Sequence, residues 1–239
     1  MFREIKKKLL ILNNRRPWTP QASACIDEMD REDWVFTCMR LDDPSVRRED
    51  VSRLLRGELA AEVPVGHYLS VEGYRRVMGL ARNLAAMEQD PDQLLCERLY
   101  MAFTGEAAPR YRENNPVLLA LDHNPPHFHQ VGQQLSILFR QLATLDFQGN
   151  PILKAAFLHN RLIEVYPFYS CSEAMARNLM YYQLLREGYP PFLLNLSEQE
   201  YYAAVRSYLK KEDMAPLYGA MERSLFNKLE VMLQLTAPG

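Results

Sequence analysis

The chain has 239 residues, a formal net charge of −2, only 10 glycines and four cysteines. A chain of this length can bury a sizeable core, and scarce glycine with abundant Leu, Met, Arg and Glu favours helices over sheets. The small net charge gives no electrostatic reason to expect nucleic acid or an anionic membrane as a partner. The cysteines are widely spaced without a CxxC pair, which favours reduced thiols over disulfides and a cytoplasmic protein.

The N-terminal region is expected to be helical. Residues 1–12 are basic and then apolar, but the apolar run is too short for a signal or membrane anchor. A first amphipathic helix or a strand is therefore expected there. Residues 20–57 are expected to form two or three short helices, broken at the Asp-Asp-Pro-Ser run around Pro44. Pro44 disfavours helix at the residue before it, Ser45 can cap the helix that follows, and Gly57 closes that helix.

The rest of the chain is also predicted to be mainly helical. Apolar spacing predicts a helix over 67–87, and Asp90-Pro91 is expected to cap and start the next, which ends at Gly105. Residues 115–126 contain a short apolar run bounded by Asn, Asp, Pro and His, the best hairpin candidate in the chain. Further helices are expected at 127–145, 150–165, 172–187, 197–209 and 214–235.

The most informative stretch is 156–177, AFLHNRLIEVYPFYSCSEAMAR. It resembles the signature of Fic-domain proteins, His-Pro-Phe-x-Asp/Glu-Gly-Asn-Gly-Arg-x-x-Arg, which lies between two helices. Pro167, Phe168 and Arg177 keep the pattern, whereas Tyr166 stands in the place of the His. The remaining changes fall on the acid, the Gly-Asn-Gly segment and the first Arg, which are replaced by Ser170, by Cys171, Ser172 and Glu173, and by Ala174.

Other segments carry the same resemblance in the same order, over roughly residues 14–210. They are the Gly105–Arg112 segment, the double proline at 125–126, the Gly-Tyr-Pro-Pro corner at 188–191 and the helix containing Tyr201. The resemblance implies a mainly α, Fic-type helical bundle with a small β-hairpin flap. Residues 1–60 would form an N-terminal helical region and residues 61–239 the core.

Fic enzymes usually transfer AMP from ATP, with Mg²⁺, to a hydroxyl of a target protein, and the resemblance therefore implies ATP and Mg²⁺. Here the general base is replaced by Tyr166, whose phenol ordinarily has a pKa near 10. Ser170 is a far weaker magnesium ligand than a carboxylate, and Glu173 would repel a triphosphate. Ala174 lacks the Arg that holds the phosphates. We therefore expect no bound cofactor and no metal, and the expected function is a non-catalytic binding or regulatory module.

Alternatives remain at individual residues. Tyr166 is either a packed aromatic side chain or an activated phenolate or self-modified residue. Arg177 either pairs with an internal acid, Asp42 or Glu173, or binds an anionic ligand. In some Fic proteins a helix before the core carries an inhibitory Glu that pairs with the second motif Arg, and Asp42 is at the matching position. We expect Glu173 to contact Arg177 directly, because i,i+4 residues share a helix face, and Asp42 to lie nearby.

The histidines are weaker candidates for a functional site. His123, His127 and His129 form an H-x3-H-x-H pattern that can suggest a metal, but two prolines intervene and no carboxylate or thiol follows closely. Surface or capping roles are favoured for them, and His159 is expected to be buried and hydrogen-bonded.

Three functions stay open: the binding module, whose 115–126 hairpin would hold an extended peptide of a protein target; an active transferase with an altered site; and a scaffold or homo-oligomerisation domain.

Overall fold

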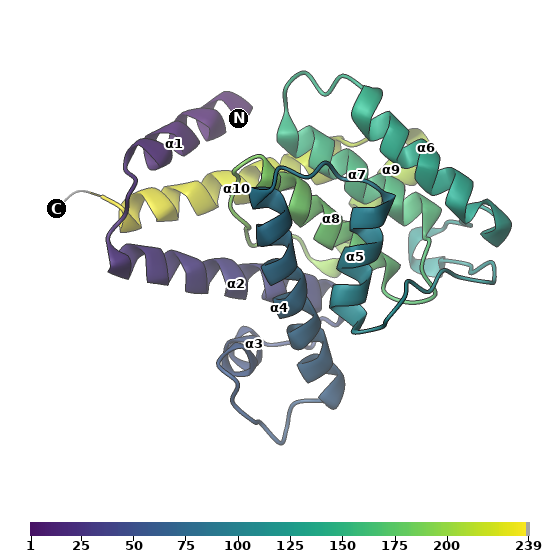
Figure 1. Ribbon diagram of the computed structural model, residues 1–239, viewed down its shortest axis with the longest axis horizontal. Coiled ribbons are helices and arrows are strands. Elements are labelled where there is room, and N and C mark those ends of the chain that lie inside the picture. Colours follow the sequence, from purple (N-terminus) through teal and green to yellow (C-terminus); the bar gives the residue numbers. More distant parts are fainter. Residues whose placement is uncertain (238–239) are drawn as a thin grey trace.

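The computed structural model describes residues 1–237, and helices make up most of this range (Figure 1). The elements are α1 (Phe2–Asn14), α2 (Pro20–Asp42), α3 (Arg48–Leu55), α4 (Val65–Ala86), α5 (Gln93–Thr104), η1 (Leu119–Leu121), η2 (Phe128–Gln130), α6 (Val131–Thr144), α7 (Pro151–Val165), α8 (Ser172–Arg186), α9 (Glu198–Lys211) and α10 (Ala215–Leu235). The mainly α prediction is confirmed. None of the described helices is both long and apolar enough to cross a membrane.

Residues 20–57 form two helices, α2 and α3, within the predicted two or three, but α2 is long rather than short. The hydroxyl of Thr19 accepts a hydrogen bond from the Ala22 amide, and Pro20 starts α2, which then runs unbroken for 23 residues. The predicted break after it is confirmed, but Ser45 does not cap α3. Its amide and hydroxyl both donate to Asp43 Oδ1, at 2.9 and 2.6 Å, so this serine closes the turn instead.

Helix α5 also begins later than predicted. Asp92, not Asp90, is its cap, because the Asp92 carboxylate accepts a hydrogen bond from the Leu95 amide at 2.7 Å. α5 packs closely against α4 at Gly73, where an added Cβ would lie 2.6 Å from the Phe103 carbonyl oxygen. Only a glycine allows this approach without displacing the α5 backbone.

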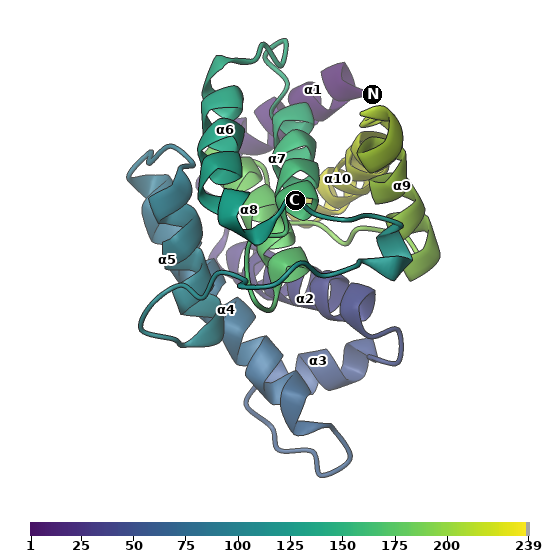
Figure 2. The same cartoon turned by 90° about the vertical axis from the view of Figure 1, so that its right-hand side faces the viewer.

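The expected β-hairpin is reduced to a turn with one antiparallel bridge, between Leu118 and His123. The 3₁₀ helix η1 occupies the tip, because a run of Leu-Ala-Leu can close a 3₁₀ turn as readily as it can form a strand. Figure 2 shows that the segment after α5 extends across the molecule to α9 and returns to α6. Arg206 of α9 donates to the Ala120 carbonyl at 2.5 Å, and Lys210 pairs with Asp122. We call residues 113–126 the flap.

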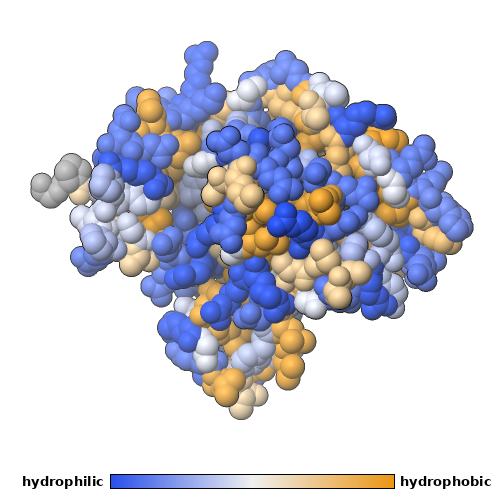
Figure 3. Space-filling view, viewed as in Figure 1, coloured by the Kyte–Doolittle hydropathy of each residue, from blue (hydrophilic) through white to orange (hydrophobic). Residues whose placement is uncertain are grey.

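Helix α8 is the centre of the core and packs against α7, α4 and α5. It is buried on nearly all sides and carries four polar residues with no exposure: Ser172, Arg177, Asn178 and Gln183. A polar side chain buried in this way needs partners in the protein. On the surface, apolar residues gather on the projection formed by α3 and the start of α4 (Figure 3), where Leu59, Val65 and Leu69 are largely exposed.

Candidate functional site

The turn between α7 and α8 holds the motif residues. Tyr166 ends α7 with a left-handed backbone, φ 47°, and Cys171 precedes α8 with φ 60°. Between them the Phe168 ring stacks between two tyrosine rings, with centroid distances of 4.4 Å to Tyr100 and 5.4 Å to Tyr111. The buried Ser172 hydroxyl accepts from the Phe168 amide at 2.9 Å. The Pro-Phe pair thus anchors the turn in the core.

Arg112 joins this turn to the flap, and it is 3% exposed. Its guanidinium donates to the carbonyl oxygens of Tyr166 at 2.8 Å and Asn114 at 2.8 Å, and also to that of Pro126. An antiparallel β-bridge between Tyr111 and Phe168 also holds the segment before the flap against the α7–α8 turn. Sequence reasoning placed Arg112 in a family-like segment without giving it this role.

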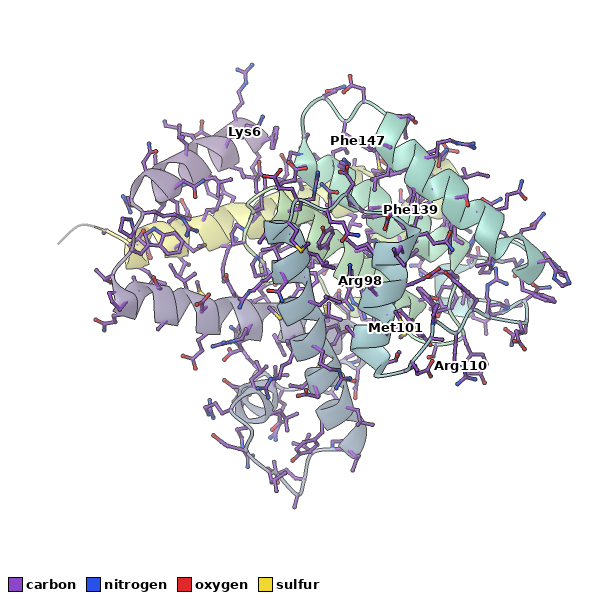
Figure 4. The ribbon with its side chains drawn as sticks, viewed as in Figure 1. Lys6, Arg98, Met101, Arg110, Phe139 and Phe147 are labelled. Carbon is purple, nitrogen blue, oxygen red and sulfur yellow. The ribbon has the colours of Figure 1, made fainter. Side chains whose placement is uncertain are left out.

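The segment just before Arg112 lies on the outside of the molecule. Arg110 is at the rim, beyond the end of α5 (Figure 4), and its guanidinium lies 5.0 Å from the centre of the exposed Tyr169 ring. A hollow of about 460 Å³ lies here, lined by Arg110, Tyr111, Asn114 and Tyr169 among others. It is open to solvent on the same side as the flap.

Arg177 pairs with Asp42, the last residue of α2. Arg177 Nη2 lies 2.5 Å from Asp42 Oδ1, and the Arg177 side chain has no exposure whereas the Asp42 side chain is 44% exposed. Burial opposes the charged form of Arg177, but Asp42 and the surrounding Tyr74, Tyr201 and Cys38 outweigh it and hold the pKa of the guanidinium well above its ordinary value. Asp42, the residue that the resemblance matches to an inhibitory Glu, thus contacts Arg177 directly.

The expectation for Glu173 was wrong. No ion pair joins Glu173 to Arg177 among the described residues, although the two share a face of α8. Arg177 turns to the end of α2 instead, and Glu173 accepts a hydrogen bond from the Tyr202 hydroxyl at 3.3 Å. Burial raises the pKa of Glu173 and the nearby Arg177 only partly offsets this. The shorter Asp42 reaches Arg177 directly because the tertiary packing places the last residue of α2 beside Arg177.

The other motif positions differ in exposure. Tyr166 is half-buried, and burial followed by the charges of Glu173 and Asp42 raises the pKa of its phenol to about 12. Ser170 is exposed, Cys171 is half-buried, and Ala174 is buried. Burial raises the pKa of the Cys171 thiol to about 12. Neither Tyr166 nor Cys171 is therefore poised to act as a base or nucleophile near neutral pH.

A buried network of hydrogen-bonded polar side chains lies next to Arg177. His159 of α7 is fully buried, as expected, and its ring contacts the Tyr201 hydroxyl through Nε2 at 2.8 Å and the Asn160 side chain through Nδ1 at 3.1 Å. Burial lowers the pKa of His159 to about 4, so the ring is neutral. The guanidinium of Arg177 lies 6.0 Å from the Tyr201 ring centre. Sequence reasoning treated this tyrosine as ordinary core and missed its contact with the motif.

The three histidines near the flap are not arranged as a metal site. His123 contacts the Glu164 carbonyl through Nε2 at 2.9 Å, which fastens the flap to α7, whereas His127 and His129 stack with Phe128 around η2. Across the described residues, no group of three or more His, Cys, Asp or Glu side chains has the arrangement that could hold a metal ion.

Comparison with known proteins defines the class. Residues 88–184 match the model of the Fic/DOC family, a range that includes the flap, Arg112 and the α7–α8 turn. The chain is 26% identical over 130 residues to "Protein adenylyltransferase Fic" of Nematostella vectensis, which covers 54% of this chain and 30% of that protein.

Solved structures show the same fold. The chain superposes on a Fic-domain-containing signaling protein from Bacteroides thetaiotaomicron with a TM-score of 0.81 and 15% identity, covering 97% of both chains. It superposes on Fic-1 from C. elegans with a TM-score of 0.77 and 18% identity, covering 96% of this chain and 72% of that one. The protein is thus a Fic-fold protein. Residues 88–184 form a domain that matches the Fic/DOC family, and the chain's match spans less than a third of the curated adenylyltransferase.

Proposed function

We propose that this protein is a Fic-fold binding or regulatory module without AMP-transferase activity. The observation that carries the proposal is the ion pair between Arg177 and Asp42. The one motif Arg retained for phosphate binding is fully buried and already holds a carboxylate at 2.5 Å. A triphosphate would have to displace Asp42 and expose Arg177 before contacting it.

The other motif positions support the same proposal, because they do not fit a magnesium triphosphate. Ser170 offers a neutral hydroxyl in place of a magnesium-binding acid, and Mg²⁺ prefers anionic oxygens. Glu173 adds a carboxylate to the first turn of α8, where a phosphate would meet the helix N-terminus. Tyr166, with a pKa of about 12, is a poor proton acceptor for an incoming hydroxyl. Phosphoryl chemistry depends on positioning and charge neutralisation, and both are reduced here.

The flap is the proposed contact surface for a protein target. Val117 is 64% exposed and Leu119 is 85% exposed, so apolar side chains face outward beside backbone that forms only one bridge. An extended peptide can add to such a segment through backbone groups and place side chains in the neighbouring hollow lined by Arg110 and Tyr169. We place this function in the cytoplasm, consistent with four free cysteines, and propose no nucleic-acid or membrane partner.

An active transferase with an altered site is the second candidate. One observation favours it: Arg177 Nε and Nη1 have no hydrogen-bond partner among the described residues. A buried guanidinium with free N–H groups can donate hydrogen bonds to a further anion. Arg177 is fully buried, so neighbouring side chains would have to move before an anion could reach these donors.

Incubation with ATP labelled at the α-phosphate and Mg²⁺ tests the choice, using the unchanged chain and Tyr166→His. We expect no label on either protein, because Tyr166→His supplies a base but no held donor. Labelling by the unchanged chain would contradict the proposal and favour the second candidate. Self-labelling by Tyr166→His alone would show that the other motif positions still hold the donor.

Peptide binding is tested separately. A peptide is first selected from a random phage-displayed library by binding to the unchanged chain. Its affinity is then measured by fluorescence polarisation for the unchanged chain, Val117→Pro and Val117→Ala. Proline removes one backbone N–H and alanine removes only the side chain. Loss of binding in Val117→Pro but not in Val117→Ala is the expected result. Equal binding by all three proteins would exclude the flap as the contact surface.

A further inference from the structure

The region around α1 carries a large share of the positive charge of the chain. Residues 1–16 contain six of the 28 Lys and Arg residues but only one of the 30 Asp and Glu residues. Since the whole chain has a formal net charge of −2, the residues outside this range are acidic overall. Such an asymmetry indicates a local electrostatic contact surface rather than a property of the whole molecule.

The inner side of α1 lies along α10 (Figure 1). Ile5 and Leu12 are completely buried in this contact. Two of the six cations serve it as well: Lys8 Nζ lies 3.1 Å from Glu230 Oε1, and Arg15 donates to a backbone carbonyl oxygen of α10 at 2.5 Å. These groups fix α1 on the molecule and are not available to a partner.

The outer side of α1 combines cations with exposed aliphatic side chains. Arg3, Lys6 and Lys7 are exposed and have no ion-pair partner within residues 1–237, and Lys6 points away from the molecule (Figure 4). Leu10 is 61% exposed and Ile11 is 38% exposed. Each follows a lysine by four positions, and residues four apart are neighbours on a helix surface. We call these five residues the outer face of α1.

The charge of the outer face favours an acidic partner. Glu4 is the single acidic residue of α1, so three unpaired cations face solvent against one carboxylate. A partner that supplies several carboxylates complements this charge. In the same contact, apolar side chains of the partner would cover Leu10 and Ile11 and remove them from water. The face therefore fits an acidic chain segment that also carries apolar residues.

An anionic membrane fits this face less well than a segment of a protein. The residues outside 1–16 are acidic overall, and an extended anionic surface would repel them. A short segment contacts α1 alone, because exposed charges more than about 10 Å apart are largely screened at 0.1 M ionic strength. Few apolar side chains of α1 could enter a bilayer, since those of its inner side lie against α10.

We propose that the outer face of α1 binds an acidic segment of a partner protein. Carboxylates of the segment pair with Arg3, Lys6 and Lys7, and its apolar side chains pack on Leu10 and Ile11. At 1.5 Å per residue α1 is roughly 20 Å long, enough to contact about three turns of a partner helix. This proposal is independent of the function proposed for the motif and the flap.

Labelled peptides test the charge argument. One peptide contains Glu and Leu with its leucines on one helix face, and a second has Gln in place of every Glu. In fluorescence polarisation with the full chain at low salt, the Glu peptide should bind saturably with a Kd of about 0.5 mM or tighter. Binding should be at least about fivefold weaker at high salt and for the Gln peptide. Equal binding of both peptides, or no saturable binding of the Glu peptide, would overturn the proposal.

Variants test whether the peptide binds at this face. Lys6→Gln with Lys7→Gln removes two exposed, unpaired cations, so the protein should fold normally and bind the Glu peptide at least about fivefold more weakly. Arg140→Gln with Lys211→Gln is the matched control. It removes two cations from α6 and the end of α9 that are also exposed and have no ion pair among the described residues. This control should bind normally, and an equal loss in both double variants would refute the site.

Two further measurements test the apolar contact and the membrane alternative. Leu10→Ala should weaken binding of the Glu peptide about twofold or more, whereas Leu69→Ala, at a comparably exposed position of α4, should not. Unchanged binding in Leu10→Ala would contradict the apolar contact. Vesicles containing phosphatidylglycerol should not retain the protein in a flotation assay at physiological salt. Retention that is lost in the Lys6 and Lys7 double variant would assign the face to lipid and overturn the proposal.

Discussion

Asp42 and Arg177 are 135 positions apart in the sequence, yet Asp42 Oδ1 lies 2.5 Å from Arg177 Nη2. The contact joins the end of α2 to the middle of α8 and places a carboxylate on Arg177, the position for which the Fic resemblance implies phosphate binding. Arg177 is fully buried, whereas Asp42 is partly open to solvent. We expect the pair to stabilise the folded chain, and in the proposed function it also closes the site.

Asp42→Asn should lower the free energy of unfolding by about 1–2 kcal/mol. Loss of one partner from a fully buried pair costs roughly 3–5 kcal/mol, but water reaches Asp42 and can partly replace it. Glu173→Gln is the matched control. Since burial already disfavours the Glu173 carboxylate, its substitution should change stability by less than about 0.5 kcal/mol. Urea unfolding at neutral pH measures both, and a larger loss in Glu173→Gln would show that Glu173 is the acid that stabilises Arg177.

His159 should make the protein less stable as the pH falls from about 6.5 toward 4. Burial lowers its pKa from 6.5 to about 4. The unfolded chain therefore takes up a proton in this range before the folded chain does, and stability is lost as the pH falls. Between pH 7 and pH 5 the unchanged chain should lose about 1–2 kcal/mol more than His159→Gln. Parallel unfolding curves for the two proteins at both pH values would show that the ring titrates normally.

Arg112→Lys should release the flap. Arg112 donates to carbonyl oxygens on both sides of the join, at Tyr166 and Asn114, and a lysine cannot reproduce this fork. We expect a loss of about 2 kcal/mol or more and faster amide hydrogen exchange in residues 113–126. Arg110→Lys, at an exposed position, should leave the exchange unchanged. If both variants exchange alike, Arg112 does not hold the flap.

Much of the fold could be predicted from local signals in the sequence. The break after α2 and the glycine that ends α5 both depend on the backbone preferences of single residues. Where two residues compete for one role, the local signal failed: Asp92 rather than Asp90 caps α5, and Ser45 bonds Asp43 rather than capping α3. Such choices depend on tertiary position.

In the candidate site, too, local sequence signals predicted some features and tertiary packing decided the others. Motif spacing placed Tyr166 and Ser170 in the turn and placed Asp42 near Arg177. It could not show which acid contacts Arg177, because the i,i+4 relation of Glu173 is a local argument and the approach of α2 is a tertiary one. The role of Arg112 depends on carbonyl oxygens from Tyr166 and Pro126, which no side-chain pattern in the sequence reveals.

Calorimetric titration with ATP and Mg²⁺ tests the central claim most directly, on the unchanged chain and on Asp42→Asn. We predict no binding tighter than about 1 mM to either protein, because removal of Asp42 restores neither the magnesium-binding acid at Ser170 nor the Arg at Ala174. Arg177→Met serves as the control for a site dependent on that residue. Micromolar binding of ATP that is lost in Arg177→Met would contradict the account and show that the site still holds a nucleotide.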